Sequence, residues 1–111
     1  MSKRNWKLFV KDILESLEKI ESYLKDLTYE DFMSDAKTKD AVVRNLEVIG
    51  EAANRIPESI RQKYELPWSQ MVGLRHRLIH GYFVVDYDIV WEIAKKELPQ
   101  LKEKVKGILR S

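Results

Sequence analysis

The sequence predicts an all-α protein, an up-and-down four-helix bundle with one or two short extra helices, and three observations support this fold class. Apolar residues recur at steps of three and four along most of the chain, the spacing that lines one face of a helix. Only 4 glycines and 3 prolines interrupt the 111 residues, and no stretch shows the strict alternation of a half-buried strand. Because this length suits one core and not two, residues 1–111 are expected to form a single helical domain.

The first long helix is expected over residues 3–27. Its apolar positions follow the helical period and are Trp6, Phe9, Ile13, Leu17, Ile20, Leu24 and Leu27. At about 1.5 Å per residue, such a helix is roughly 35 Å long, about the length of a small bundle. Thr28 is followed three positions later by Asp31, a capping-box pattern that predicts a short helix over residues 29–33.

The second long helix is expected over residues 38–55. Its apolar stripe steps by four and three through Val42, Leu46, Ile49, Ala53 and Ile56. Pro57 marks the end of this helix and also suits the first turn of a short helix that reaches residue 63. Another helix is expected to approach closely at the small residues Gly50, Ala52 and Ala53.

A third helix is expected over residues 68–80, followed by a loop over residues 81–85 that opens with a glycine. Asp86 is then expected to cap the final helix. The apolar stripe of that helix consists of Val90, Ala94, Leu98, Leu101, Val105 and Ile108. Pro99 lies within this helix and lacks a backbone donor, so a kink is expected over residues 95–98.

The composition excludes several classes of protein. The chain has no cysteine, which rules out disulfides, thiolate metal sites and a catalytic cysteine. The first residues are charged and amphipathic, and no apolar run approaches 18 residues, so we expect neither a signal peptide nor a membrane span, and we expect a cytoplasmic protein. A formal net charge of +2 is too small to indicate nucleic-acid binding, which must therefore depend on a local cluster of charge.

One such cluster gathers both histidines of the chain and two arginines within six residues: Arg75, His76, Arg77 and His80. On the expected helix, His76 and His80 share one face. A solvated basic surface is one interpretation. A zinc site with Asp86 or Asp88 as a third ligand is another, which the neighbouring arginines and the lack of a third histidine disfavour. The third is phosphate chemistry, because an arginine fork binds phosphate oxygens and histidine transfers protons near neutral pH.

These residues resemble the signature of HepT-like toxins, which belong to the HEPN superfamily of small all-helical ribonucleases. The signature is an arginine, a polar residue, three further residues, a histidine, any residue and a tyrosine. In this sequence its places are filled by Arg75, His76, His80 and Tyr82. The stretches 44–53 and 86–91 are also similar to this family, so the resemblance covers most of the chain.

The resemblance implies a HEPN-like domain that acts as a metal-independent endoribonuclease toxin, without a cofactor, in a homodimer whose two motifs face one cleft. Arg75 and His80 are the expected catalytic residues. The residues expected to support RNA binding or orient the motif are His76, Arg77 and Glu51. The resemblance also implies a type VII-like toxin–antitoxin pair, in which a cognate nucleotidyltransferase antitoxin (MntA-like) transfers AMP to a tyrosine near the motif. Tyr82 is the best-placed acceptor, although an aromatic beside Phe83 is also typical of packing.

Two surface features are expected near the motif. Arg75, His76 and His80 should lie in or beside a solvent-accessible groove between subunits, not beneath the core. An apolar surface that a four-helix core does not absorb should form an isologous dimer contact, through Trp68, Met71, Val72, Phe83 and Val84. The alternative function is a non-catalytic helical subunit that binds the nucleotidyltransferase and presents its substrate without cleaving RNA.

Overall fold

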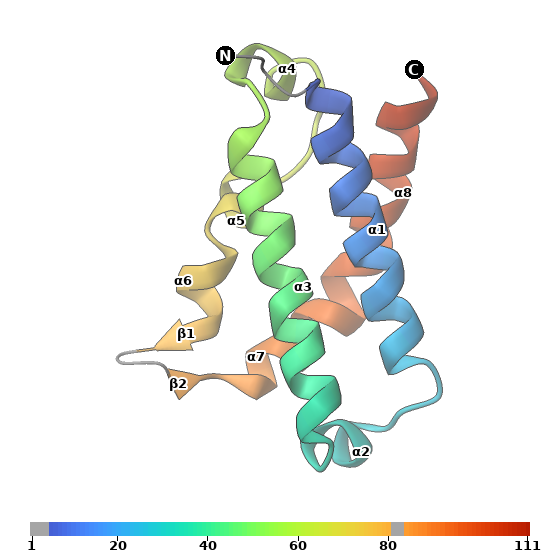
Figure 1. Ribbon diagram of the computed structural model, residues 1–111, viewed down its shortest axis with the longest axis vertical. Coiled ribbons are helices and arrows are strands. Elements are labelled where there is room, and N and C mark those ends of the chain that lie inside the picture. The colour runs from blue at the N-terminus through green and yellow to red at the C-terminus, as the bar shows by residue number, and fades with distance from the viewer. Residues whose placement is uncertain (1–4, 81–83) are drawn as a thin grey trace.

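Three long helical segments and a broken fourth one form an up-and-down bundle in the computed structural model, which describes residues 5–80 and 84–111 (Figure 1). In the view of Figure 1, the chain descends through α1 (Trp6–Leu24) and rises through α3 (Ala36–Arg55). It descends again through α5 (Trp68–Val72) and α6 (Leu74–Leu78). It then rises through α7 (Tyr87–Glu92), η1 (Ile93–Glu97) and α8 (Leu98–Arg110). The short helices are α2 (Tyr29–Met33) and α4 (Glu58–Arg61). The predicted all-α fold class and the two short extra helices are therefore confirmed.

The core is built from the predicted apolar stripes. Its largest fully buried side chains include Ile13, Leu17, Ile20, Val42, Leu46, Ile49 and Val90. Every position of the stripe predicted for the final helix is buried. Full burial of one large apolar side chain contributes about 1.5–3 kcal/mol, more than the helix-propensity differences among most residues, so the stripes decide which faces meet. Among the described helices, none is long and apolar enough to cross a membrane.

Helix beginnings follow the capping residues of the sequence. The predicted capping box is present: the Asp31 N–H donates to Thr28 Oγ1 at 3.1 Å, and the Thr28 N–H donates to Asp31 Oδ2 at 3.0 Å. α3 begins two residues before the expected start because the Asp35 carboxylate accepts the Thr38 N–H at 3.0 Å and caps the helix there. Pro57 separates α3 from α4, as predicted.

Proline distorts the final helix, but as a widened turn. Pro99 has no N–H to donate to the preceding turn. The turn before it is the π-helical segment η1, in which the Leu98 N–H donates to the Ile93 carbonyl, five residues earlier. The distortion overlaps the predicted kink at residues 95–98, and the helix continues beyond it as α8.

The predicted helix over residues 68–80 is wrong in two places. It breaks at Gly73, where the backbone turns between α5 and α6, and it ends at Leu78. The next residues form β1 (Ile79–His80), which pairs antiparallel with β2 (Val84–Val85) and places His80 opposite Val84. The expected loop therefore ends before Val84, and residues 81–83 lie outside the described residues. Extended backbone prevails at these positions because β-branched side chains prefer it.

The close helix approach predicted at Gly50 is confirmed. Gly50 is buried, and a Cβ atom added to it would lie 3.0 Å from the Met71 carbonyl oxygen of α5. The lack of a side chain thus lets α5 lie directly against α3. This contact sets the position of the segment that continues into α6.

Candidate active site

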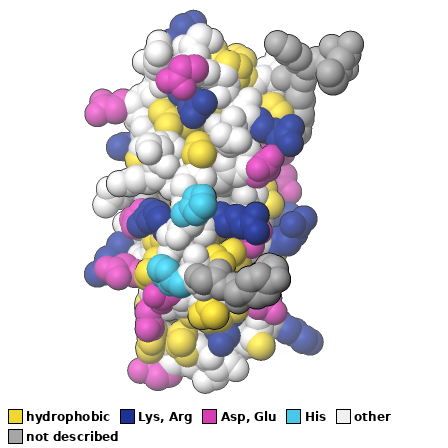
Figure 2. All heavy atoms as spheres, turned by 90° about the vertical axis from the view of Figure 1, so that its left-hand side faces the viewer, with side chains coloured by type: hydrophobic (Ala, Val, Ile, Leu, Met, Phe, Trp, Pro, Cys, Tyr) yellow, Lys and Arg dark blue, Asp and Glu magenta, His cyan; other side chains and the backbone are white. Residues whose placement is uncertain are grey.

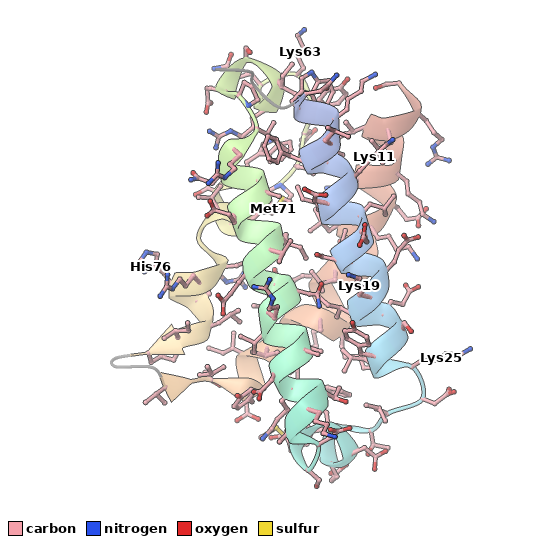
Figure 3. The ribbon with its side chains drawn as sticks, in the orientation of Figure 1. Lys11, Lys19, Lys25, Lys63, Met71 and His76 are labelled. Carbon is pink, nitrogen blue, oxygen red and sulfur yellow. The ribbon has the colours of Figure 1, made fainter. Side chains whose placement is uncertain are left out.

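Helix α6 presents Arg75 and His76 to solvent. Leu74 and Leu78 lie one turn apart and are both buried, with 3% and 0% of their surfaces exposed. Because these two leucines face the core, the positions between them point outward, and both Arg75 and His76 are exposed. Figure 3 shows His76 projecting away from the bundle.

His80 lies on β1, so the prediction that it shares a helical face with His76 is wrong. The backbone turns extended at Ile79, with φ −110° and ψ 120°, which ends α6 before His80 is reached. The side chain of His80 is 56% exposed. Both histidines are nevertheless exposed on the same side of the molecule (Figure 2). In this view, basic side chains lie to the left and to the right of the upper histidine. The predicted solvent exposure of Arg75, His76 and His80 is confirmed, and their position between two subunits stays a prediction.

Asp86 faces His80 from the start of α7. Its Oδ2 lies 3.6 Å from His80 Nε2. Its Oδ1 accepts the N–H groups of Asp88 and Ile89, both at 3.1 Å, which confirms the predicted helix cap. Its own N–H donates to the Leu78 carbonyl at 2.8 Å. One carboxylate oxygen is thus used by the helix cap and the other is directed at the histidine.

A groove of about 590 Å³ lies beside the exposed face of α6, between α6, α3 and α1. Arg75 and His76 line it, together with charged residues of α3 that include Arg44, Glu47, Glu51 and Arg55. Within the described part of the chain, the ion pair of Glu51 is with Arg55 on its own helix, at 3.0 Å. Both side chains are more than 60% exposed. Glu51 is therefore a neighbour of the motif in the groove, with its carboxylate directed along α3.

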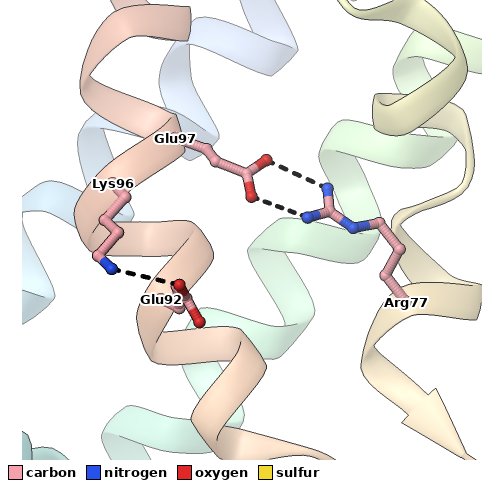
Figure 4. Close-up of polar contacts among 4 residues, drawn as sticks. All are labelled: Arg77, Glu92, Lys96 and Glu97. Carbon is pink, nitrogen blue, oxygen red and sulfur yellow. Dashed lines mark hydrogen bonds and ion pairs between the residues drawn. The ribbon is translucent and has the colours of Figure 1, made fainter.

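The side chain of Arg77 is bound by Glu97 of η1 (Figure 4). Its Nη1 and Nη2 donate to the two carboxylate oxygens of Glu97 at 3.1 and 2.8 Å. These hydrogen bonds raise the pKa of the Arg77 guanidinium above its ordinary value. Glu97 uses two of the five N–H donors of this guanidinium, so fewer donors remain for a phosphate than on Arg75. The pair thus connects α6 to η1, a role that the sequence pattern does not indicate.

The other expected site features have different outcomes. Tyr82 and Phe83 lie outside the described residues. The prediction that Met71 belongs to an exposed apolar surface near the motif is wrong, because Met71 is 2% exposed and belongs to the core. Val84 is 62% exposed, whereas Trp68 and Val72 are half-buried. Within residues 5–80 and 84–111, no three His, Asp or Glu side chains are arranged to hold a metal ion.

The helical bundle with an exposed Arg–His segment has the architecture of a HEPN-like domain. The model of the ribonuclease HepT-like family matches residues 13–108, and the chain belongs to this family. It is 47% identical to "Putative RNase MJ1216" of Methanocaldococcus jannaschii over 111 residues, which cover 99% of this chain and 92% of that protein. It is 43% identical to "Probable ribonuclease HepT" of Thermococcus cleftensis over 103 residues, 92% of this chain and 94% of that protein. No solved structure matches the chain.

Proposed function

We propose that this chain is a metal-independent endoribonuclease toxin in which Arg75 and His80 carry out the chemistry. Membership of a ribonuclease family and the names of the relatives support RNA as the substrate. The observation that carries the assignment is the exposure of Arg75, His76 and His80 on one side of the molecule, where Arg75 and His76 also line a groove. Among the described residues, neither the Arg75 nor the His76 side chain is engaged in a hydrogen bond or ion pair, so both are available to a ligand.

The proposed reaction uses the nucleophile that RNA carries. His80 removes the proton of a 2′-hydroxyl, and the resulting oxygen attacks the adjacent phosphorus. The bond from phosphorus to the 5′-oxygen of the next nucleotide then breaks, which leaves a 2′,3′-cyclic phosphate. Arg75 binds the non-bridging oxygens and stabilises the additional negative charge of the pentavalent transition state.

A homodimer would complete this chemistry. The departing 5′-oxygen needs a proton, and the His80 that has just accepted one is on the wrong side of an in-line displacement. In a two-fold dimer with both motifs facing one cleft, the second copy of His80 supplies this proton as a general acid. Val84, 62% exposed beside His80, is an apolar side chain that such a contact would cover.

We further propose that a nucleotidyltransferase antitoxin controls the enzyme by transferring AMP to Tyr82. Tyr82 is separated from His80 by a single residue in the sequence. An attached AMP carries a phosphate, and we expect an arginine of the motif such as Arg75 to bind it through its guanidinium fork. The attached AMP would therefore occupy the cleft as an analogue of the RNA substrate and inhibit cleavage.

An RNA cleavage assay with matched variants tests the proposed activity. Arg75→Ala and His80→Ala should each lower the cleavage rate by roughly 10²–10³-fold, the usual loss when a charge-stabilising or proton-transferring group is removed. Arg110→Ala removes the same charge from the exposed end of α8 and should cleave at the wild-type rate. Activity should persist in EDTA. Equal behaviour of all four proteins would show that the chain is a non-catalytic subunit.

Mass spectrometry tests the proposed control. After incubation with the antitoxin and ATP, the wild type should gain AMP-sized increments that Tyr82→Phe does not. Tyr23→Phe is the matched control, because Tyr23 is an exposed tyrosine on α1, outside the motif. Increments that persist in Tyr82→Phe would show that another residue is modified.

A further inference from the structure

We propose that Asp86 is a positioning residue that fixes the proton and the orientation of the His80 imidazole for RNA cleavage. This inference rests on the proposed ribonuclease function. The two oxygens of the Asp86 carboxylate have different partners. Oδ1 caps α7, and Oδ2 lies 3.6 Å from His80 Nε2. A single side chain therefore connects the start of the final helix to the histidine of the motif.

The carboxylate is rigidly held, which a positioning role requires. Two N–H groups of α7 bind Oδ1, and the Asp86 N–H is bonded to the Leu78 carbonyl at the end of α6. About a third of the side chain, 35%, is exposed, so its rigidity depends on these hydrogen bonds. The separation of 3.6 Å is longer than a hydrogen bond, as is common for catalytic contacts that tighten when substrate binds.

The contact predicts which imidazole nitrogen does the chemistry. A carboxylate accepts hydrogen bonds and does not donate them, so it favours the neutral ring with its proton on Nε2. Nδ1 then carries the free lone pair and takes the proton of the 2′-hydroxyl. When that proton arrives, the imidazolium keeps its Nε2–H toward Asp86, whose negative charge stabilises it. The serine-protease triad uses a carboxylate in the same way.

The neighbouring acid Asp88 differs from Asp86 in its partner. Its Oδ1 accepts the hydroxyl of Tyr29, and this hydrogen bond raises the pKa of that phenol. Asp88 is exposed and lies in the same first turn of α7. Asp88→Asn therefore removes an equal charge from the same place without removing the carboxylate that faces His80, and it is the matched control for Asp86→Asn.

The substitution Asp86→Asn should keep the helix cap and replace only the carboxylate oxygen that faces His80. Asparagine caps helices as well as aspartate does, so α7 should remain folded, which a thermal melt verifies. With its carbonyl used by the cap, the amide presents an N–H group to His80 Nε2 and should shift the neutral ring toward the Nδ1–H form. Long-range ¹H–¹⁵N spectra measure this directly. His76, the only other histidine in the chain, provides an internal reference that should not change.

The kinetic expectation is a selective loss of turnover. Asp86→Asn should lower kcat by roughly tenfold or more and leave KM for an RNA oligonucleotide unchanged, because Asp86 acts on the proton transfer and does not touch RNA. Asp86→Ser, whose hydroxyl caps the helix but is too short to reach His80, should also lose kcat without imposing the Nδ1–H form. Asp88→Asn should retain the wild-type kcat and the wild-type His80 spectrum.

The two readouts distinguish a failure of this inference from a failure of the proposed function. An unchanged His80 nitrogen spectrum in Asp86→Asn would refute the contact, whatever the protein does to RNA. An altered spectrum with an unaltered kcat would refute the positioning role. If the wild type fails to cleave RNA while the spectrum responds, the contact is supported, but both the ribonuclease function and the positioning role of Asp86 in RNA cleavage are refuted.

Discussion

The contact between α3 and α5 at Gly50 provides a quantitative test of the packing that positions the motif. Alanine at position 50 adds one methyl group, whose carbon would lie 3.0 Å from the Met71 carbonyl oxygen and 3.7 Å from that of Val72. Gly107 on α8 is a matched site, because it is also helical and nothing lies within 4 Å of an added Cβ. The same substitution at the two glycines therefore isolates the contact.

The expected magnitudes follow from two opposing effects. Replacing glycine by alanine in a helix interior stabilises the helix by about 1 kcal/mol, and Gly107→Ala should gain this in full. At Gly50 the new methyl group meets backbone atoms, so α5 must shift, and such overpacking typically costs about 1–3 kcal/mol. Gly50→Ala should therefore be destabilising by about 0–2 kcal/mol, which leaves the two variants about 1–3 kcal/mol apart.

Urea unfolding followed by circular dichroism measures this difference at a fixed protein concentration. Gly107→Ala should raise the midpoint above that of the wild type, and Gly50→Ala should not. The dependence of the unfolding free energy on urea should be the same for all three proteins, since the surface exposed on unfolding hardly changes. Equal stabilisation by both substitutions would show that α5 does not rest against Gly50.

Three further substitutions test other parts of the fold by the same assay. Thr28→Ala removes one half of the capping box with Asp31 and should lower the unfolding free energy by about 1 kcal/mol. Leu78→Ala removes a fully buried side chain at the end of α6 and should cost about 2–5 kcal/mol. A hydrogen bond from Lys102 lowers the pKa of Glu21, so Glu21 stabilises the fold above its unfolded pKa, and this stability is lost as pH falls through its folded value. Glu21→Gln should therefore flatten the loss of stability below about pH 4.5, and an acid limb as steep as that of the wild type would contradict this account.

Most of the bundle is predictable from the sequence because long apolar stripes constrain it repeatedly. Each stripe of α1, α3 and α8 supplies several positions with the same period, so an error at one position does not change the face that is buried. Helix caps are predictable for a different reason, since they are local: Thr28 and Asp86 bind N–H groups only two or three residues away.

The segment that carries the motif is less predictable. Helix-like spacing continues from Trp68 to His80, but the break at Gly73 depends on how α5 packs against α3. The strands β1 and β2 have two residues each, too few to show alternation. The pair between Arg77 and Glu97 joins residues 20 positions apart, and although Pro99 predicts a distortion near Glu97, no local pattern indicates the partner of that carboxylate.

The break after Leu78 also changes what the Arg–His spacing means. On a continuous helix, five residues place His80 roughly 140° around the axis from Arg75, so the two side chains would point to different sides. The extended backbone at Ile79 instead carries His80 away from the end of α6 and brings it opposite Asp86, while Arg75 remains on the helix beside the groove. The two residues are thus held by different parts of the fold: Arg75 by the packing of α5 and α6 on α3, and His80 by the strand pair and the cap of α7. A substitution in the α3–α5 contact should therefore affect the position of Arg75 most directly, whereas a substitution at Asp86 should affect His80 most directly.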